Sequence, residues 1–184
     1  MFINFWYPAI AGSDLTADKP VRVQMLDHWF VLFRDSAGTA RCLADTCAHR
    51  GGALGAGRVR QGNVECPYHG WQFDGDGRCR SIPSLGPEGK IPPRAKVDSY
   101  PVQEQYGIVF AFLGDLPEAE RPPLMPIPEY GTPGWRANLI VFDVRCNFER
   151  SMENGLDPSH NEFVHPTHGF EGERGDYRVP DLDI

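Results

Sequence analysis

The chain has 184 residues, of which 41% are hydrophobic and 23% charged, and its formal net charge is −7. This composition is ordinary for a folded protein and excludes a disordered chain, while the negative charge argues against nucleic acid as a partner. The N-terminal residues lack a basic stretch followed by an apolar run, and no segment approaches the ~20 apolar residues of a bilayer span. We therefore expect a cytoplasmic protein with no signal peptide and no membrane contact.

Short apolar runs separated by turn residues recur through the first 115 residues. The runs of strand length are 21–26, 29–33, 63–66, 71–73 and 108–113. Turns are expected at Asp35–Gly38 and Asp74–Gly77, because Asp-Gly pairs tolerate a positive φ at low cost. Short strands with such closely spaced turns predict a small antiparallel β domain.

The second part of the chain begins with a proline-rich stretch. Residues 116–134 contain six prolines and little hydrophobic periodicity, which is typical of a semi-rigid connector between domains. Beyond it, Leu139–Phe142 is predicted to be a buried strand and Phe148–Leu156 a short helix. We therefore predict one domain over 1–115, the connector over 116–134, and the opening of a second domain over 135–184.

The cysteines do not follow the spacing of a disulfide framework. Cys47 and His49 form C-x-H, and after sixteen residues Cys66 and His69 form C-x-x-H. Two thiolates and two imidazoles at this spacing can bind zinc or a 2Fe–2S cluster. The glycines and proline around both pairs favour the cluster, because tight loops leave backbone N–H groups free to face a buried anion. Three further cysteines are expected to be buried structural thiols: Cys42, Cys79 and Cys146.

A second group of candidate ligands follows the predicted helix, at Asp157, His160 and His165. Two imidazoles and a carboxylate suit non-haem iron(II). On a regular helix the two histidines would be about 140° apart, but Pro166 disfavours a helical conformation at His165. We therefore expect the helix to end or distort there. Asp157 followed by Pro158 is also typical of a helix N-terminus, and capping is compatible with a functional role because a carboxylate has two oxygens.

Both groups resemble those of a known family. The segments TCAHRGG (Thr46–Gly52) and CPYHGWQFDGDG (Cys66–Gly77) are similar to the two cluster loops of Rieske non-haem iron oxygenases. Respiratory Rieske proteins carry an extra cysteine in each loop, and its absence here favours the oxygenase or ferredoxin type. The resemblance implies a small antiparallel β-sandwich with two cluster-binding loops, followed by the opening of an α+β catalytic domain. It also implies four ligands of a Rieske 2Fe–2S cluster: Cys47, His49, Cys66 and His69.

The resemblance further implies that His160 and His165 bind a mononuclear Fe(II). Asp157 would connect His160 to a cluster histidine, His69, across a subunit boundary. The implied activity is that of a mono- or dioxygenase that uses O2 to hydroxylate or demethylate a small organic substrate, as in aromatic hydrocarbon catabolism. A ferredoxin or a flavin reductase would supply the electrons, and the complete protein would be a homotrimer.

Two other functions stay open. A Rieske ferredoxin, which only carries electrons, needs only about the first 115 residues, so the connector and the later histidines count against it. A zinc-stabilised binding module is the third possibility. The resemblance also has a limit, because the family's third, carboxylate iron ligand lies far downstream. The carboxylates after His165 do not occupy that position: Glu171, Glu173, Asp176, Asp181 and Asp183.

A cluster of arginines surrounds the candidate loops. Five arginines lie among three carboxylates, a local balance of +2 in an acidic chain: Arg50, Arg58, Arg60, Arg78 and Arg80. Each arginine by itself is expected to solvate a turn or to pair with a nearby carboxylate. Together they predict a positive surface to which an acidic electron donor would be steered.

Overall fold

The computed structural model describes residues 3–160 and Val164. The strands within these residues are β1 (Phe5–Ala11), β2 (Val21–Met25), β3 (His28–Arg34), β4 (Ala40–Ala44), β5 (Arg58–Arg60), β6 (Asn63–Glu65), β7 (Gln72–Phe73), β8 (Cys79–Ser81), β9 (Ser99–Tyr100), β10 (Val102–Gln105) and β11 (Ile108–Leu113). The helices are α1 (Phe148–Leu156) and the short 3-10 turns η1 (Gly12–Asp14), η2 (Leu54–Ala56), η3 (Pro83–Leu85), η4 (Glu118–Glu120) and η5 (Pro158–His160). No described helix has the length and apolar character of a membrane span.

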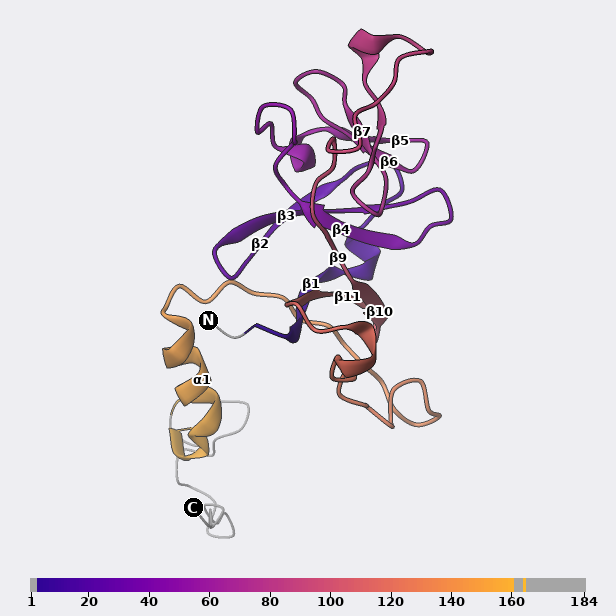
Figure 1. The fold of residues 1–184 in the computed structure, drawn as a ribbon. Coiled ribbons are helices and arrows are strands. Elements are labelled where there is room, and N and C mark those ends of the chain that lie inside the picture. The colour runs from indigo at the N-terminus through magenta and orange to yellow at the C-terminus, as the bar shows by residue number, and fades with distance from the viewer. Residues whose placement is uncertain (1–2, 161–163, 165–184) are drawn as a thin grey trace, which may run out of the picture. The chain divides into compact units, whose positions relative to one another are not determined.

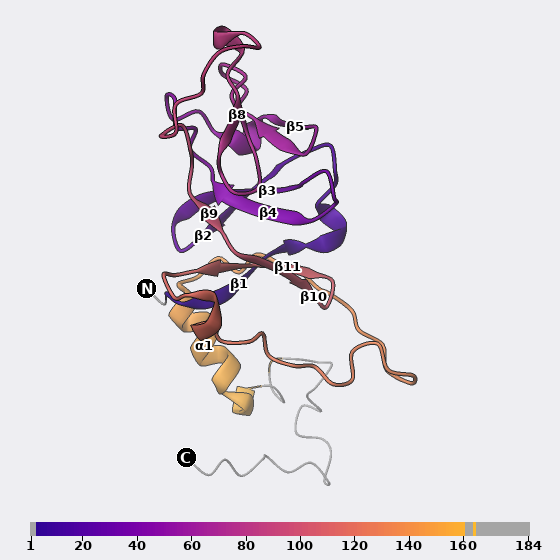
Figure 2. The ribbon, with the colours of Figure 1, turned by 45° about the vertical axis from the view of Figure 1, so that its right-hand side comes forward.

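The strands form three sheets, with the orders β1-β11-β10, β2-β3-β4-β9 and β5-β6-β7-β8. Every strand pairing in them is antiparallel. The predicted antiparallel β fold is therefore confirmed. All three sheets belong to one compact unit, Met1–Leu139, and Ile140–Ile184 forms a second unit, which is described separately. Within the first unit, the sheet of β2, β3 and β4 lies between the other two (Figures 1 and 2).

Strand β3 explains this three-layer arrangement. Alternate side chains of a strand point to opposite faces, and a strand buried on both faces therefore reads as a continuous apolar run. Val31 and Phe33 pack into the core beside β6 and β7, whereas Phe30 and Leu32 pack into the core beside β11. The sheet in the middle thus separates two hydrophobic cores. The strands predicted at 21–26 and 29–33 are confirmed as β2 and β3.

The two predicted turns are also confirmed. The N–H of Gly77 donates to the carbonyl of Asp74 at 3.0 Å, and that of Gly38 donates to Asp35 at 2.9 Å. Both glycines have a positive φ, 77° and 78° respectively. At Gly77 a Cβ would also come within 2.1 Å of the Val97 carbonyl oxygen, so glycine is required there for space as well as for conformation.

The second unit corrects one prediction and confirms another. No strand forms at Leu139–Phe142, where Ile140 and Val141 are each 77% exposed. A strand must pair its backbone N–H and C=O groups with a neighbour, and none of the described residues provides one to this segment. The helix predicted at Phe148–Leu156 is present as α1, and the Asn147 side chain accepts the Glu149 N–H at 2.9 Å, which caps its first turn.

The cysteines outside the candidate cluster motif differ in burial. Cys42 and Cys79 are buried, as predicted. Cys146 is exposed, so its prediction as a buried thiol is wrong. The reason is local, because it lies in the same exposed stretch as Leu139–Phe142, where the described residues form no core around it.

Candidate metal centre

The first candidate loop, residues 46–52, follows β4 and is closed by two backbone hydrogen bonds. The N–H of Cys47 donates to the carbonyl of Gly52 at 2.9 Å, and the N–H of Gly51 donates back to the carbonyl of Cys47 at 2.9 Å. Gly51 has a φ of +70°, which favours glycine. The loop therefore turns tightly directly after the cysteine.

The second loop, residues 66–71, connects β6 to β7 and repeats this plan. The N–H of Cys66 donates to the carbonyl of Trp71 at 2.8 Å, and the N–H of Gly70 donates to Cys66 at 3.0 Å. Gly70 has a φ of +72°, close to that of Gly51. In both loops a cysteine is thus followed, four residues later, by a glycine that closes the turn on it.

The two loops bring the predicted cluster ligands together as two pairs, the two cysteines and the two histidines. A Cβ on Gly52 of the first loop would lie 3.0 Å from Sγ of Cys66 in the second, so the loops touch at that sulfur. The thiol of Cys66 lies close enough to that of Cys47 to raise its pKa. The rings of His49 and His69 lie 4.5 Å apart between centroids, at 64° to each other. The cysteines are buried, at 3% and 2% exposure, whereas both histidines are exposed.

Burial controls the protonation of this site. It raises the pKa of Cys47 to about 11, against the opposing hydrogen bonds from the backbone N–H groups of His49 and Arg50, and the neighbouring Cys66 raises it further. In the absence of a cation the Cys47 thiol is therefore protonated at neutral pH, and binding of a metal would release its proton. Desolvation, followed by the charges of His69 and Arg50, lowers the pKa of His49. A lowered pKa favours the neutral imidazole, which is the form that binds metals.

Two aromatic side chains that the motif analysis did not identify contact the histidines. The indole of Trp71 stacks on His49 with the centroids 4.7 Å apart. Tyr68 lies over His69 with the centroids 3.8 Å apart and the rings tilted by 32°. Both aromatic residues belong to the second loop. Their position beside the ligands in its sequence was the only feature that could have identified them. These contacts restrict the orientation of the imidazoles.

The donor set fits a two-iron cluster. Among the described residues, no group of three or more His, Cys, Asp or Glu side chains is placed to hold a single metal ion. The four ligands instead form a buried pair of thiols and an exposed pair of imidazoles. In a Rieske cluster one iron takes two thiolates and the other takes two imidazoles, which is the pairing that these loops present.

In the second unit, Asp157 and His160 lie next to each other. Asp157 accepts the Ser159 N–H at 3.0 Å and also the Ser159 hydroxyl, and so caps η5. The predicted cap is thus present, on a 3-10 turn. These hydrogen bonds lower the pKa of Asp157. Its Oδ2 lies 4.0 Å from Nδ1 of His160. His165, the other predicted ligand, and the carboxylates after it lie outside the described residues.

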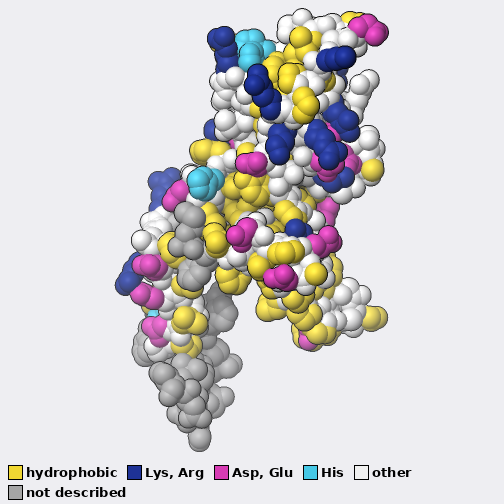
Figure 3. All heavy atoms as spheres, viewed as in Figure 1, with side chains coloured by type: hydrophobic (Ala, Val, Ile, Leu, Met, Phe, Trp, Pro, Cys, Tyr) yellow, Lys and Arg dark blue, Asp and Glu magenta, His cyan; other side chains and the backbone are white. Residues whose placement is uncertain are grey.

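Lys and Arg side chains gather over the part of the first unit that carries β5–β8 (Figure 3). Four of the five arginines around the loops are paired with carboxylates: Arg58 and Arg60 with Glu65, Arg78 with Asp76, and Arg80 with Asp74. The expectation that each arginine by itself pairs with a nearby carboxylate is therefore confirmed for these four, and the pairing of β5 with β6 sets Arg58 opposite Glu65. Among the described residues, no carboxylate forms an ion pair with Arg50.

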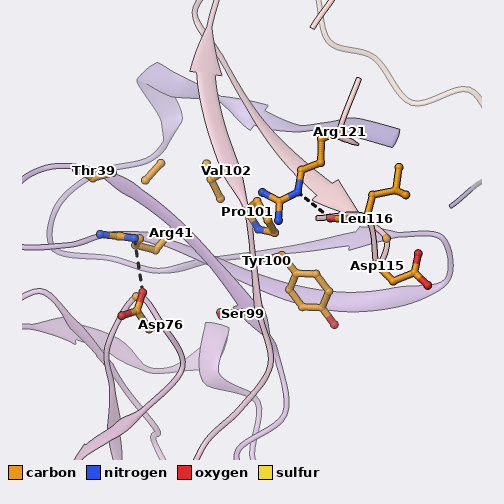
Figure 4. Close-up of a pocket in the computed structure, with 13 residues that line it drawn as sticks. Thr39, Arg41, Asp76, Ser99, Tyr100, Pro101, Val102, Asp115, Leu116 and Arg121 are labelled. Atoms are coloured by element: carbon orange, nitrogen blue, oxygen red, sulfur yellow. Dashed lines mark hydrogen bonds and ion pairs between the residues drawn. The ribbon is translucent and has the colours of Figure 1, made fainter. Parts of the chain in front are cut away.

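A separate pocket of about 470 Å³ lies where β4 and β9 meet the start of the connector (Figure 4). Its lining carries both signs of charge. Arg41 lies 4.0 Å from Asp76, and Nε of Arg121 donates to the carbonyl of Leu116 at 3.1 Å. None of the predicted metal ligands lines this pocket, so it is not part of the metal centre.

Comparisons with known proteins agree with this geometry. The chain is 34% identical over 166 residues to the 3-chlorobenzoate-3,4-dioxygenase oxygenase subunit of Comamonas testosteroni, covering 88% of this chain and 37% of the relative. It is 38% identical over 165 residues to the 4beta-methylsterol monooxygenase of Methylococcus capsulatus, covering 88% and 44%. The solved structure of dicamba monooxygenase bound to 3,6-dichlorosalicylic acid matches with a TM-score of 0.75 and 32% identity, over 88% of this chain and 47% of that one.

The chain thus spans less than half the length of each of these relatives. Their names are those of mono- and dioxygenases. The family model of the Rieske [2Fe-2S] domain matches residues 5–101, more than half of the chain. This chain therefore belongs to the Rieske [2Fe-2S] domain family, and its relatives include Rieske oxygenase subunits.

Proposed function

We propose that this chain is the Rieske part, with the opening of the catalytic domain, of the terminal component of a Rieske non-haem iron oxygenase. Its reaction would be the O2-dependent hydroxylation or demethylation of a small organic substrate, often an aromatic one. The division into a Rieske domain over 1–115, a connector over 116–134 and a catalytic part from 135 belongs to the same proposal.

The proposed ligands form two sets. The 2Fe–2S cluster would be held by the residues of the two loops: Cys47, His49, Cys66 and His69. The mononuclear iron(II) would be held by His160 and His165, with Asp157 connecting His160 to His69 of a neighbouring subunit. When bound, the cluster would supply single electrons and the iron would supply dioxygen activation. The role of the two loops is to orient the imidazoles and to keep the sulfurs away from water.

The observation that carries the proposal is the contact between the loops at Cys66. Gly52 leaves space beside this sulfur that no larger residue would leave. The His49 and His69 rings of the same two loops lie 4.5 Å apart between centroids. This arrangement supports a bound group that joins both thiols and both imidazoles. The match to the dioxygenase subunit covers 88% of the chain and so necessarily extends past residue 101, which favours an oxygenase over a Rieske ferredoxin that only carries electrons.

The test is the metal content of the purified chain. We expect two irons and two acid-labile sulfides per chain for the cluster, with a brown colour. Cys66→Ser should abolish the colour, whereas Cys79→Ser, at a buried cysteine of the same core, should keep it. Stoichiometric zinc without labile sulfide would instead support a zinc-stabilised binding module and refute the proposal.

The proposed partners follow from the reaction. A ferredoxin or a flavin reductase would reduce the cluster, and the complete protein would act as a homotrimer. The proposed homotrimer is tested by sedimentation of the protein that carries the complete catalytic domain. A monomer in this experiment would refute the trimer. The partner part is tested by the rate at which a reduced ferredoxin bleaches the oxidised cluster.

A further inference from the structure

The two buried charged side chains of the described residues both lie within two residues of a candidate cluster cysteine in the chain. They are Asp45, which is 3% exposed, and Glu65, which is 8% exposed. Asp45 lies two residues before Cys47, and Glu65 lies directly before Cys66. A buried carboxylate is costly unless it is paired and hydrogen-bonded, so its partners indicate what it does.

Asp45 ties the end of β4 to two other elements. Its Oδ2 accepts from Nε of Arg22 on β2, and its Oδ1 accepts the N–H of Gly55 in η2. The side chain of Asp45 is completely buried, whereas that of Arg22 is 43% exposed. The Arg22 guanidinium lies 4.0 Å from the ring centroid of Trp29, which holds the cation in place. The start of the first loop is thus fixed to the middle sheet.

Glu65 does the same for the second loop. Nε and a terminal nitrogen of Arg58 on β5 donate to its Oε1, at 2.7 and 2.6 Å. On the other side, the side-chain amide of Gln72 on β7 donates to its Oε2 at 2.7 Å. Glu65 therefore connects β6 to both neighbouring strands, immediately before the cysteine.

The two networks share a charge arrangement. In each, the carboxylate is on the chain segment that leads into the cysteine, and the arginine reaches it from another strand, with 43% of the Arg22 side chain and 66% of the Arg58 side chain exposed. Arg60, also on β5, lies 3.7 Å from Glu65 as well. Consecutive Cα atoms are 3.8 Å apart, so each carboxylate belongs to a residue whose Cα is within about 8 Å of that of a cluster cysteine. Charges on residues this near in the chain, in a partly desolvated region, are expected to act measurably on the addition of another charge to the cluster.

We propose that Asp45 and Glu65 are positioning residues for the two cluster loops, and that the charge balance within the pairs Arg22–Asp45 and Arg58–Glu65 sets the reduction potential of the cluster. This inference rests on the proposed function, in which the loops hold a cluster. Reduction transfers one electron from an external ferredoxin-type donor to the cluster and so adds one negative charge there. Removing a carboxylate charge therefore favours the reduced cluster, and removing an arginine charge favours the oxidised one.

The experiment is a redox titration of the cluster-loaded protein and four charge-neutralising variants. Asp45→Asn and Glu65→Gln should increase the equilibrium constant for reduction by about two- to tenfold, which is about 18 to 59 mV for a one-electron couple. Arg22→Gln and Arg58→Gln should decrease it by a similar factor. The double variant with Arg22→Gln and Asp45→Asn should return close to the wild-type potential.

A matched control is available in a similar ion pair elsewhere. Glu104 of β10 pairs with Arg34 at 2.9 Å, in a sheet that lies on the far side of the middle sheet from β5–β8 (Figures 1 and 2). Glu104→Gln should leave the potential unchanged. A purely structural role would move the potential in the same direction whichever member of a pair is changed, so shifts of equal sign would overturn the inference.

The outcomes also separate this inference from the proposed function. Wild-type protein without labile sulfide would refute the proposed function itself. Wild-type protein with a normal cluster spectrum, but with potentials that do not respond to the four variants, would refute only the charge-balance inference. If Asp45→Asn loses its cluster, Arg22→Gln and Arg58→Gln still decide the question, because both replace partly exposed side chains.

Discussion

The indole of Trp71 lies parallel to the imidazole of His49, with 1° between the ring planes and 4.7 Å between the centroids. Trp71 also packs against the hydrophobic core that contains both cluster cysteines. It therefore connects the exposed imidazole side of the candidate centre to the interior of the domain. Tyr68 contacts His69 in a similar way, but it is 63% exposed and lies outside that core.

Trp71→Ala should lower the free energy of unfolding by about 2 kcal/mol, less than for a fully buried tryptophan because the ring is only half-buried. Trp71→Phe should lower the free energy of unfolding much less, since it keeps an aromatic ring beside His49. Urea unfolding of the cluster-loaded protein measures both values. Tyr68→Ala is the control and should cost clearly less than Trp71→Ala. Equal losses for the two alanine variants would contradict the assigned role of Trp71.

Gly52→Ala should reduce the cluster content of the purified protein. The added methyl group would lie 3.0 Å from Sγ of Cys66 and would displace the sulfur or the first loop. The adjacent Gly51→Ala is the matched control, since nothing lies within 4 Å of its Cβ position and its cost of about 1 kcal/mol arises from its positive φ. Labile sulfide per chain should therefore fall in Gly52→Ala and stay close to wild type in Gly51→Ala. The reverse order would show that space beside the sulfur is unimportant.

His160→Ala, in protein with the complete catalytic domain, should remove the mononuclear iron and leave the visible spectrum of the cluster nearly intact. The reason is that different segments of the chain supply the proposed ligands of the two metals. Iron analysis together with absorption spectroscopy measures both effects. His28→Ala, at an exposed histidine that begins β3, should retain both metals. Bleaching of the cluster by His160→Ala would refute the division into two sites.

Arg50→Gln should slow reduction of the cluster by an acidic donor at low ionic strength and weaken the salt dependence of the rate. Arg50 follows His49 directly, and among the described residues no carboxylate neutralises it, so its charge is available for steering. Arg78→Gln changes the net charge equally, but Arg78 already lies 3.9 Å from Asp76. Stopped-flow reduction across a salt series should therefore show a smaller effect for Arg78→Gln. Identical rates for both variants at all salt concentrations would exclude a special role for Arg50.

Acid should destabilise the first unit partly through Asp35. Burial by itself raises the pKa of this carboxyl group, but hydrogen bonds from Arg41 and from the N–H groups of Thr39 and Ala37 outweigh it and lower the pKa. A carboxyl group whose pKa is lower in the folded state than in the unfolded state stabilises the fold at pH values above its unfolded-state pKa of about 3.9. This stabilisation is lost as the pH falls through the folded-state pKa. The unfolding free energy of Asp35→Asn should therefore depend less on pH below about 4 than that of the wild type. Parallel pH profiles would contradict this assignment.

The sequence by itself determined the features that depend on neighbouring residues. The run Trp29–Phe33 was predicted to be a strand, and Asp74–Gly77 was predicted to be a turn, because backbone conformation responds to local side chains. The spacing of the four candidate cluster ligands identified the two loops in the same local way. Leu139–Phe142 shows the limit of this reasoning, because an apolar run forms a strand only where another strand pairs with it.

Only the tertiary structure decided which side chains meet. Arg58 and Arg60 contribute to a positive surface when residues are counted along the chain, but the register of β5 against β6 turns them into partners of Glu65. The stacking of Trp71 on His49 likewise joins two loops that are separate in sequence. Charge pairing and ring stacking depend on distances of a few ångströms between residues far apart in the chain. Strand register and loop closure set those distances, which is why counting residue types could not identify which partner each side chain has.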